Sequence, residues 1–275
     1  MKKTALITGA TGVIGHAIAK RFSQDGFVLI LAGRSKDKLV ALEAEFGPST
    51  ITAVIDVGDE KNVKDVFAEV KNRFGTLDAM VVASGTYGAI GSVESCDINA
   101  WMDAIRTNLL GTMLTVKYAI PLMKERGGSI ITFAGGGEGP LPHFSAYVSS
   151  KGGVIRFTET VAKELEEYQI RVNAIAPGAV NSGLVTQLLD AGPERAGADA
   201  YARAKEQMET GGVSPERAAE LVSFLASDAS RGITGRVLSA LHDRFTDLPK
   251  HLTDLNTSDV YTWRRIKPKD RGYDW

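Results

Sequence analysis

The sequence predicts an α/β protein built on a doubly wound parallel sheet, with helices on both faces in three α/β/α layers. Over residues 1–180, short apolar runs alternate with segments whose apolar residues recur at helical spacing, as in repeated βαβ units. Some of these runs, such as Phe27–Ala32, are apolar throughout, which is typical of parallel strands that are buried on both faces.

Each expected element follows from the pattern of its own segment. In the first helix the apolar residues fall on one face and stop near a glycine; they are Val13, Ile14, Ala17, Ile18 and Phe22. The expected strands are Thr4–Thr8, Phe27–Ala32, Ile51–Ile55, Ala79–Ala83, Ser129–Phe133, Arg171–Ala176 and Arg236–Leu241. The first expected helix runs from residue 13 to about 26, and the second follows the second strand and ends at residue 46. Further helices are expected at 63–74, 98–124 and 147–168, and a last one begins at Pro215 after the cap candidate Ser214.

Two segments break this regularity. Residues 181–212 carry Gly, Ala and mixed charges in a looser pattern, and we expect residues 183–212 to form a helical lid. Residues 242–275 are turn-rich and dense in charges of both signs. We therefore expect a single domain, residues 1–241, followed by an ordered surface tail at 242–275.

Composition excludes several classes of function. The formal net charge of −1 gives no electrostatic reason to expect nucleic acid or an anionic membrane as a partner. Cys96 is the only cysteine, so no intrachain disulfide is possible and a cytoplasmic location is the expectation. The four histidines lack the spacing of a metal site, and no apolar run is long enough to span a membrane.

A glycine-rich turn follows the first strand directly. The segment reads Thr8-Gly-Ala-Thr-Gly-Val-Ile-Gly15 and leads into a helix. Between a strand and a helix, such glycines permit a tight turn and close approach of the backbone to a pyrophosphate, which the helix N-terminus attracts. The turn therefore predicts a dinucleotide site, the alternative being a plain connection between strand and helix.

The end of the second strand indicates which dinucleotide binds. An acidic residue there would accept hydrogen bonds from the ribose hydroxyls and repel a 2′-phosphate. This chain has Gly33-Arg34-Ser35 instead, where a small residue leaves space and a guanidinium suits a phosphate. NADP (NADPH) is therefore favoured and NAD is possible; the alternative for Arg34 is a solvated surface arginine.

A phenol and an ammonium lie one helical turn apart in Tyr147-Val-Ser-Ser-Lys151. Residues at this spacing share one helix face. Free tyrosine titrates near pH ~10, and bringing it to neutral working pH requires roughly 4 kcal/mol. A neighbouring lysine cation favours the phenolate, and an oxidised nicotinamide is a second cation that would add to the effect. The alternative is a tyrosine that packs in the core.

The ordered set of motifs over residues 3–240 resembles the short-chain dehydrogenase/reductase family, in its non-extended size class. The set comprises the glycine turn, Asp56-Val57, Leu77-Asp78, Gly85, Asn108, the Tyr147/Lys151 pair and Pro177-Gly178. The resemblance implies a Rossmann-like fold and hydride transfer between a nicotinamide and a ketone or secondary alcohol. It also implies a homodimer or homotetramer.

The resemblance assigns roles to particular residues. Tyr147 would be the general acid/base, Lys151 would lower its pKa and hold the nicotinamide ribose, and Asn108 would position the lysine through water. The residues implied in cofactor binding are Gly9, Thr11, Gly12, Ile14, Gly15, Gly33, Arg34, Ser35, Asp56, Val57, Ala83, Ser84, Gly85, Asn108, Tyr147, Lys151, Pro177, Gly178 and Val180.

Three departures from the family pattern stand out. The glycine spacing Gly9-x-x-Gly12-x-x-Gly15 is closer to that of the extended members, and the loop after the fourth strand reads Val82-Ala83-Ser84-Gly85. The family's serine, about thirteen residues before the tyrosine, is absent from Phe133-Ala-Gly-Gly-Gly137. Losing such a donor typically raises a barrier by ~3–4 kcal/mol. Candidate substitutes are the glycine backbone N–H groups, Ser145 and His143.

The leading hypothesis is an NADP-dependent oxidoreductase that acts on a small carbonyl or alcohol. The missing serine leaves open a catalytically silent NADP-binding sensor or structural subunit. The glycine spacing leaves open a sugar epimerase or dehydratase, although the tail is short for the substrate domain of such an enzyme.

Overall fold

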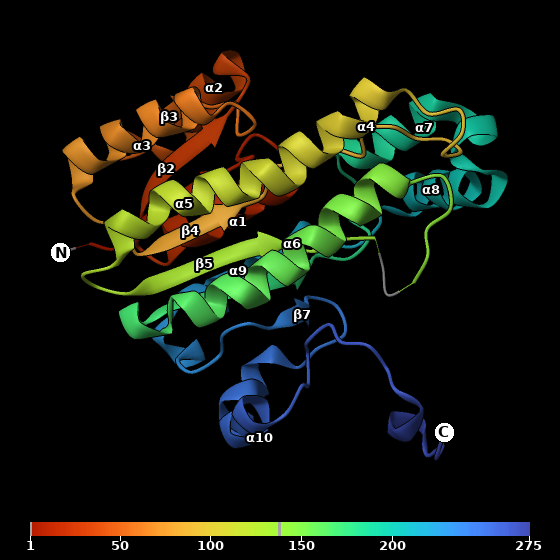
Figure 1. Ribbon diagram of the computed structural model, residues 1–275. Coiled ribbons are helices and arrows are strands. Elements are labelled where there is room, and N and C mark those ends of the chain that lie inside the picture. Colours follow the sequence, from red (N-terminus) through yellow and green to blue (C-terminus); the bar gives the residue numbers. More distant parts are fainter. Residues whose placement is uncertain (1, 137–138) are drawn as a thin grey trace.

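The computed structural model describes residues 2–136 and 139–275. Within these residues, seven parallel strands form one sheet in the order β3-β2-β1-β4-β5-β6-β7 (Figure 1). Their bounds are β1 Thr4–Thr8, β2 Val28–Gly33, β3 Ile51–Val54, β4 Ala79–Val82, β5 Gly128–Phe133, β6 Ile170–Ala176 and β7 Val237–Ser239. The chain turns back across the sheet between β3 and β4, so the switch point where such folds bind ligands lies between the carboxyl ends of β1 and β4.

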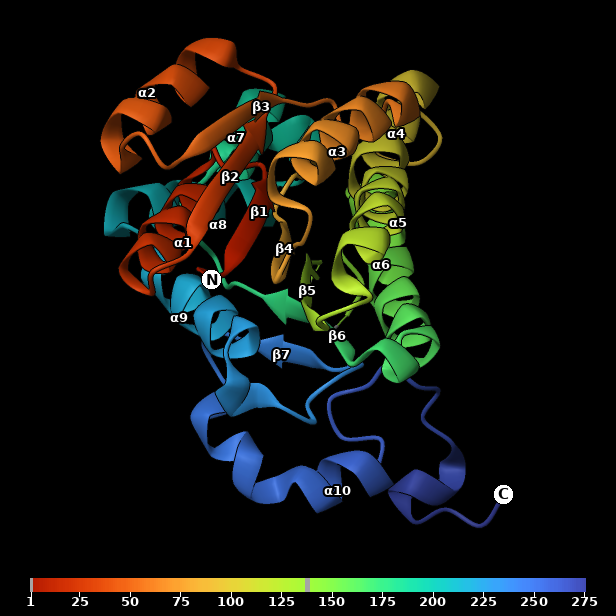
Figure 2. The same ribbon diagram turned by 90° about the vertical axis from the view of Figure 1, so that its left-hand side faces the viewer.

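Helices cover both faces of the sheet, as the continuous apolar strands predict. One hydrophobic cluster joins the sheet to α1 (Val13–Gln24), α2 (Lys36–Phe46) and α9 (Pro215–Ala226). A second cluster joins the opposite face to α3 (Glu60–Phe74), α5 (Gly111–Met123) and α6 (Ser145–Glu164). Figure 2 shows α1 and α9 on one side of the strands and α5 and α6 on the other. The predicted three-layer fold class is confirmed.

The expected helix over 98–124 contains a local change of geometry. It begins as α4 (Ile98–Ala104), widens into the π-helical turn η1 (Ile105–Leu110) and continues as α5. Wide turns of this kind recur at functional sites. Here the turn carries Asn108, which is fully buried.

The segment expected to form a lid is helical and comprises α7 (Gly183–Ala196), which is kinked at Gly192, and α8 (Ala198–Thr210). Figure 1 places both at the end of the molecule toward which the strands point. The segment between β6 and α7 is tied to the end of α8, because Val180 bridges Gly212 and the N–H of Val213 donates to the carbonyl of Ala179 at 2.9 Å.

The tail is more than a surface segment. Phe245, Leu248 and Leu255, in η4 (Phe245–His251) and α10 (Leu252–Thr257), are buried in the cluster of α1 and α9. The buried Arg236 donates to the carbonyls of Ser258 and Val260. The first half of the 242–275 segment therefore completes the core beyond β7; the rest, with η5 (Pro268–Arg271), runs on to the C-terminus.

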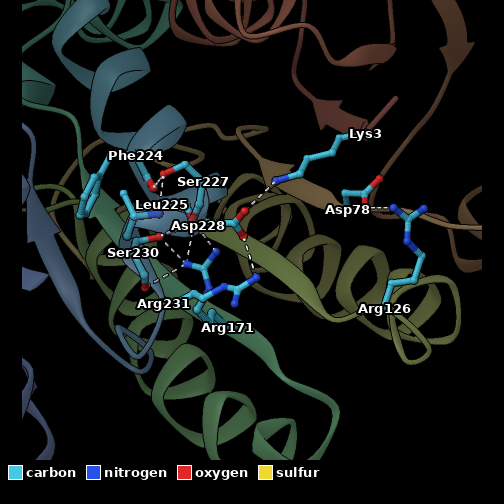
Figure 3. A network of polar contacts seen from close by, with 11 residues as sticks. Lys3, Asp78, Arg126, Arg171, Phe224, Leu225, Ser227, Asp228, Ser230 and Arg231 are labelled. Carbon is cyan, nitrogen blue, oxygen red and sulfur yellow. Dashed lines mark hydrogen bonds and ion pairs between the residues drawn. The ribbon is translucent and has the colours of Figure 1, made fainter. Parts of the chain in front are cut away.

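Polar contacts fix the amino edge of the sheet (Figure 3). Arg171, at the start of β6, donates to the carbonyls of Leu225 and Ser227 and to the Ser230 hydroxyl, and burial lowers the pKa of its guanidinium to about 10. Arg126 pairs with Asp78 at 3.2 Å. The end of the sheet opposite the switch point is therefore held rigidly. Across residues 2–136 and 139–275, none of the helices combines the length and apolar character required to traverse a bilayer.

Candidate active site

The glycine turn has the geometry that close backbone approach requires. Gly9 has a φ of 67°, and a Cβ there would lie 2.7 Å from the backbone of Ala83 and Ser84. A Cβ on Gly15 would lie 2.3 Å from the carbonyl oxygen of Gly9. Gly12 is the N-cap of α1 and provides no side chain to its first turn. The helix therefore begins with backbone N–H groups suited to an anion.

The other cofactor candidates line the same edge of the sheet. A Cβ on Gly33, which ends β2, would lie 3.3 Å from the Thr11 side chain, so the two loops touch. Arg34 is exposed, and Ser35 is the N-cap of α2 without a side-chain cap bond. Among the remaining candidates of the first three loops, Ile14 is partly buried, Val57 is buried, and the Asp56 carboxylate accepts from the N–H of Gly58 at 2.9 Å.

Tyr147 and Lys151 lie on one face of α6, as their spacing predicts, and both are buried. The Lys151 Nζ donates to the carbonyl of Phe133 at 2.9 Å and lies 5.9 Å from the centre of the Tyr147 ring. Gly85 is adjacent to both parts of the site, because a Cβ there would lie 3.4 Å from Asn108 Oδ1 and 3.8 Å from Lys151 Nζ. The fold thus brings together four residues from three separate segments of the sequence.

Asn108 holds the loop that follows β4. Its Oδ1 accepts from the N–H of Thr86 at 2.9 Å, and its Nδ2 donates to the Thr86 carbonyl and the Ser150 hydroxyl, both at 2.8 Å. Its own carbonyl accepts from the Thr112 hydroxyl at 2.5 Å. Asn108 therefore joins the π-helical turn, the β4 loop and α6.

The pKa of the Tyr147 phenol is raised in this structure, opposite to the direction expected from the neighbouring lysine. Burial penalises the phenolate, and the nearby Tyr87 adds to the effect. Burial also lowers the pKa of Lys151 to about 8. Burial therefore outweighs the neighbouring lysine in setting the direction of the shift in the pKa of this phenol.

We expect Lys151→Met to be more stable than the natural chain at pH 7. The folded-state pKa of Lys151, about 8, lies below its ordinary 10.5. Burying the charged amine therefore lowers the free energy of unfolding. This penalty is absent above pH 10.5, grows as the pH falls from 10.5 to 8, and is complete below pH 8. After allowing for the lost bond to Phe133, the gain in unfolding free energy is on the order of 2 kcal/mol. Denaturant titrations at several pH values check this: the gain should shrink from pH 8 toward 10.5, and no gain at pH 7 would contradict it.

Gly135 faces the phenol, one position after Ala134, which lies thirteen residues before Tyr147 where the family has its serine. A Cβ on Gly135 would lie 2.2 Å from the Tyr147 hydroxyl oxygen, so the phenol occupies the space of a side chain there. Ala134 is buried on the other side, against Ile155 and Ala174. Neither position therefore offers room for a serine hydroxyl beside this phenol. Gly137 lies outside the described residues.

Of the two side-chain substitutes proposed from the sequence, Ser145 bonds elsewhere, whereas the Nδ1 atom of His143 is buried without a hydrogen-bond partner within the described residues. The Ser145 hydroxyl accepts from the indole N–H of Trp101 at 3.1 Å, and a residue two positions from Tyr147 faces another side of the helix. The His143 ring packs at the start of α8, where a Cβ on Gly197 would lie 3.1 Å from its Cδ2. The candidate that adjoins the phenol is a backbone donor near Gly135.

The loop after β6 completes the edge of the site. Pro177 is partly buried, Gly178 has a φ of 85°, and Val180 is buried. A left-handed φ is easy for glycine, and it allows the chain to turn from β6 toward the lid. Ala83 and Ser84 are partly buried at the end of β4, against the glycine turn.

Residues of α7, in the segment expected to form a lid, belong to the hydrophobic surroundings of Tyr147. Tyr147 forms a hydrophobic cluster with Phe144 and with Val185 and Leu188 of α7. Tyr87 meets the Tyr147 ring edge-on, with ring centres 4.8 Å apart and planes at 71°. Sequence reasoning missed Tyr87, although an aromatic residue two positions after Gly85 at the carboxyl end of a strand was an available signal.

A cavity of about 1040 Å³ lies away from this site. It is lined at the amino edge by residues such as Lys3 and Phe27, which precede β1 and β2, and by Phe224 and Phe245. Its position opposite the carboxyl ends of the strands separates it from the Tyr147 chemistry.

Comparison with known proteins agrees with this geometry. The family model described as enoyl-(acyl carrier protein) reductase matches residues 9–240. A 3-oxoacyl-[acyl-carrier-protein] reductase of Thermotoga maritima is 35% identical over 242 residues, covering 86% of this chain and 95% of that protein. Actinorhodin polyketide ketoreductase, solved as a variant with NADPH, has a TM-score of 0.77 and 28% identity, covering 86% of this chain and 95% of its own. NAD⁺-bound xylitol dehydrogenase has a TM-score of 0.76 and 29% identity, covering 86% and 96%.

The fold and the site therefore define an oxidoreductase with a dinucleotide-type α/β sheet. The chain belongs to the short-chain dehydrogenase/reductase family. The resemblance stated from the sequence is confirmed.

Proposed function

We propose that this protein is an NADP-dependent oxidoreductase that transfers a hydride between the nicotinamide and a ketone or secondary alcohol, with Tyr147 as general acid/base. The observation that carries the proposal is the convergence of Tyr147, Lys151, Asn108 and Gly85 beside the switch point of the sheet. The solved relatives with NADPH and NAD⁺ support the choice of cofactor class.

The residues present fit a dinucleotide. Gly9 and Gly15 admit no side chain, and the first turn of α1 presents backbone N–H groups for a pyrophosphate. By the family resemblance, Asp56 and Val57 would contact the adenine, and Pro177, Gly178 and Val180 would border the nicotinamide. Lys151 and Tyr147 would hold the nicotinamide ribose.

Arg34 is proposed to select NADP over NAD. It is exposed at the end of β2, beside the small Gly33, and a guanidinium binds a phosphate by charge-assisted hydrogen bonds. We expect Arg34→Ala to raise the Kd for NADPH by about 10–100-fold and to leave the Kd for NADH within about twofold. Fluorescence titration with both nucleotides checks this, with Lys38→Ala, a nearby exposed cation, as control. Equal losses for NADPH and NADH would contradict the role.

The proposed chemistry at this chain's residues is a proton transfer. When bound, the nicotinamide supplies or accepts the hydride. In the reducing direction Tyr147 donates its hydroxyl proton to the carbonyl oxygen, and in the oxidising direction it takes that proton back. The Lys151 ammonium stabilises the phenolate left behind. The backbone N–H near Gly135 is the proposed donor to the substrate oxygen in place of the family's serine hydroxyl.

The surroundings of the phenol favour an apolar substrate body. Phe144, Tyr87, Val185 and Leu188 pack around Tyr147 from the loops and the lid. A charged group carried next to the carbonyl would lose its hydration against these side chains at considerable cost. We therefore propose that uncharged ketones are preferred over keto acids and phosphorylated ketones.

NADPH oxidation at saturating cofactor tests the proposal over matched carbonyls, for example cyclohexanone against 4-oxocyclohexanecarboxylate. Turnover of the uncharged ketone is expected. The absence of turnover with every carbonyl and every alcohol, despite tight NADPH binding, would contradict the proposal and favour a silent NADP-binding sensor or structural subunit. The second candidate is favoured by the glycine at position 135, because this residue faces the phenol and has no hydroxyl to offer a substrate. A homodimer or homotetramer and a cytoplasmic location stay predictions.

A further inference from the structure

One side chain of the lid bonds the loop that follows β4. The Gln187 carboxamide oxygen, on α7, accepts from the Thr86 hydroxyl at 3.0 Å and from the backbone N–H of Tyr87 at 3.1 Å. Gln187 is exposed, so its contact with the loop lies at the rim of the lid. These two bonds exist only while α7 rests against the loop.

The same loop is held from its inner side by Asn108. The Asn108 carboxamide bonds both the N–H and the carbonyl of Thr86, and it donates to Ser150 on α6. Two carboxamides, one on the lid and one on the π-helical turn, thus hold adjacent residues of a single short segment. A continuous series of hydrogen bonds joins α7 to the helix that carries Tyr147 and Lys151.

The segment between the two carboxamides sets the position of an aromatic ring on the phenol. The Tyr87 ring lies edge-on to Tyr147, with centres 4.8 Å apart, and 5.0 Å from the ring of Phe144. Tyr87 also contributes to the raised pKa of Tyr147. Any shift of the Tyr87 backbone therefore changes the environment of the Tyr147 hydroxyl.

We infer that Gln187 is a positioning residue: by accepting from Thr86 and Tyr87, it couples closure of the lid to the placement of the Tyr87 ring over Tyr147. Its consequence for catalysis rests on the proposed function. We call the two hydrogen bonds from Thr86 and Tyr87 to Gln187 the latch. The latch is a property of the folded chain and is measurable without any substrate.

Three variants separate the latch from general effects on the lid. Gln187→Leu keeps a side chain of similar size and removes the acceptor. Gln187→Glu keeps an oxygen acceptor at the same place. Thr186→Leu makes the same hydrophobic addition at the neighbouring exposed position of α7, whose side chain makes no hydrogen bond within the described residues.

Hydrogen exchange at the Tyr87 amide is the first measurement, in the free protein and with NADPH. Loss of one hydrogen bond of ordinary strength is expected to speed this exchange about tenfold in Gln187→Leu. Gln187→Glu and Thr186→Leu should exchange at the rate of the natural chain. Unchanged exchange in Gln187→Leu would overturn the latch.

Steady-state kinetics is the second measurement. In Gln187→Leu, kcat/KM for the carbonyl is expected to fall about tenfold while KM for NADPH is unchanged, and Gln187→Glu should restore it. Faster exchange with an unaltered kcat/KM would overturn the positioning role. Absence of turnover in the natural chain would count against the proposed function, and the exchange rates would then decide the latch alone.

Discussion

Gly135→Ala is expected to lower kcat for carbonyl reduction about a hundredfold. A Cβ at this position would lie 2.2 Å from the Tyr147 hydroxyl oxygen, far inside the contact distance of two such atoms, so the phenol must move. Misplacing a reacting group by about 1 Å typically reduces a rate about 10²-fold. Tyr147 is closely packed by Phe144 and Tyr87, which leaves it few alternative positions. The rate of NADPH oxidation with the preferred ketone measures the effect.

The matched control lies in the same loop. A Cβ on Gly139 meets no heavy atom of the described residues within 4 Å, so Gly139→Ala should keep kcat and thermal stability close to those of the natural chain. Gly135→Ser carries the same Cβ and is expected to be no more active than Gly135→Ala, even though it adds a hydroxyl next to the position of the family's serine. Natural activity in Gly135→Ala, or increased activity in Gly135→Ser, would show that the phenol does not occupy this space during turnover.

Local patterns in the sequence predicted most of the sheet and the cofactor edge. Short runs rich in apolar residues identified the seven strands to within a residue or two, because strands buried in a parallel sheet are predominantly apolar. The glycine turn was recognisable because its physical requirement, close backbone approach at Gly9 and Gly15, is itself local. The one-turn spacing also placed Tyr147 and Lys151 on one helix face.

Properties that depend on packing between distant segments could not be predicted from the sequence. Helical periodicity over 98–124 does not reveal the π-helical turn at Asn108. The contacts of Gln187 with Thr86 and of Tyr87 with Tyr147 join residues from separate elements. The raised pKa of Tyr147 results from burial under the lid, and the core role of Phe245 depends on how the tail returns to α9. None of these follows from residue spacing.

Tyr147→Phe is expected to reduce kcat about 10²–10⁴-fold, the usual contribution of a positioned acid/base group. The substitution removes one hydroxyl oxygen from a buried ring, so the fold should be preserved, and losing one hydrogen bond to the nicotinamide ribose should raise the Kd for NADPH by no more than about tenfold, which saturating NADPH offsets. Tyr168→Phe is the control, since Tyr168 lies in the 3-10 turn η2 (Glu166–Tyr168) beyond the end of α6, beside Lys124, and its loss of a hydroxyl should leave kcat unchanged.

The decisive measurement is the rate of ketone-dependent NADPH oxidation by Tyr147→Phe, with NADPH saturation verified by fluorescence. A phenol that supplies the proton predicts full NADPH binding with turnover lower than that of the natural chain and of Tyr168→Phe by at least about a hundredfold. Turnover within about tenfold of the natural chain, with NADPH bound, would contradict proton transfer by Tyr147.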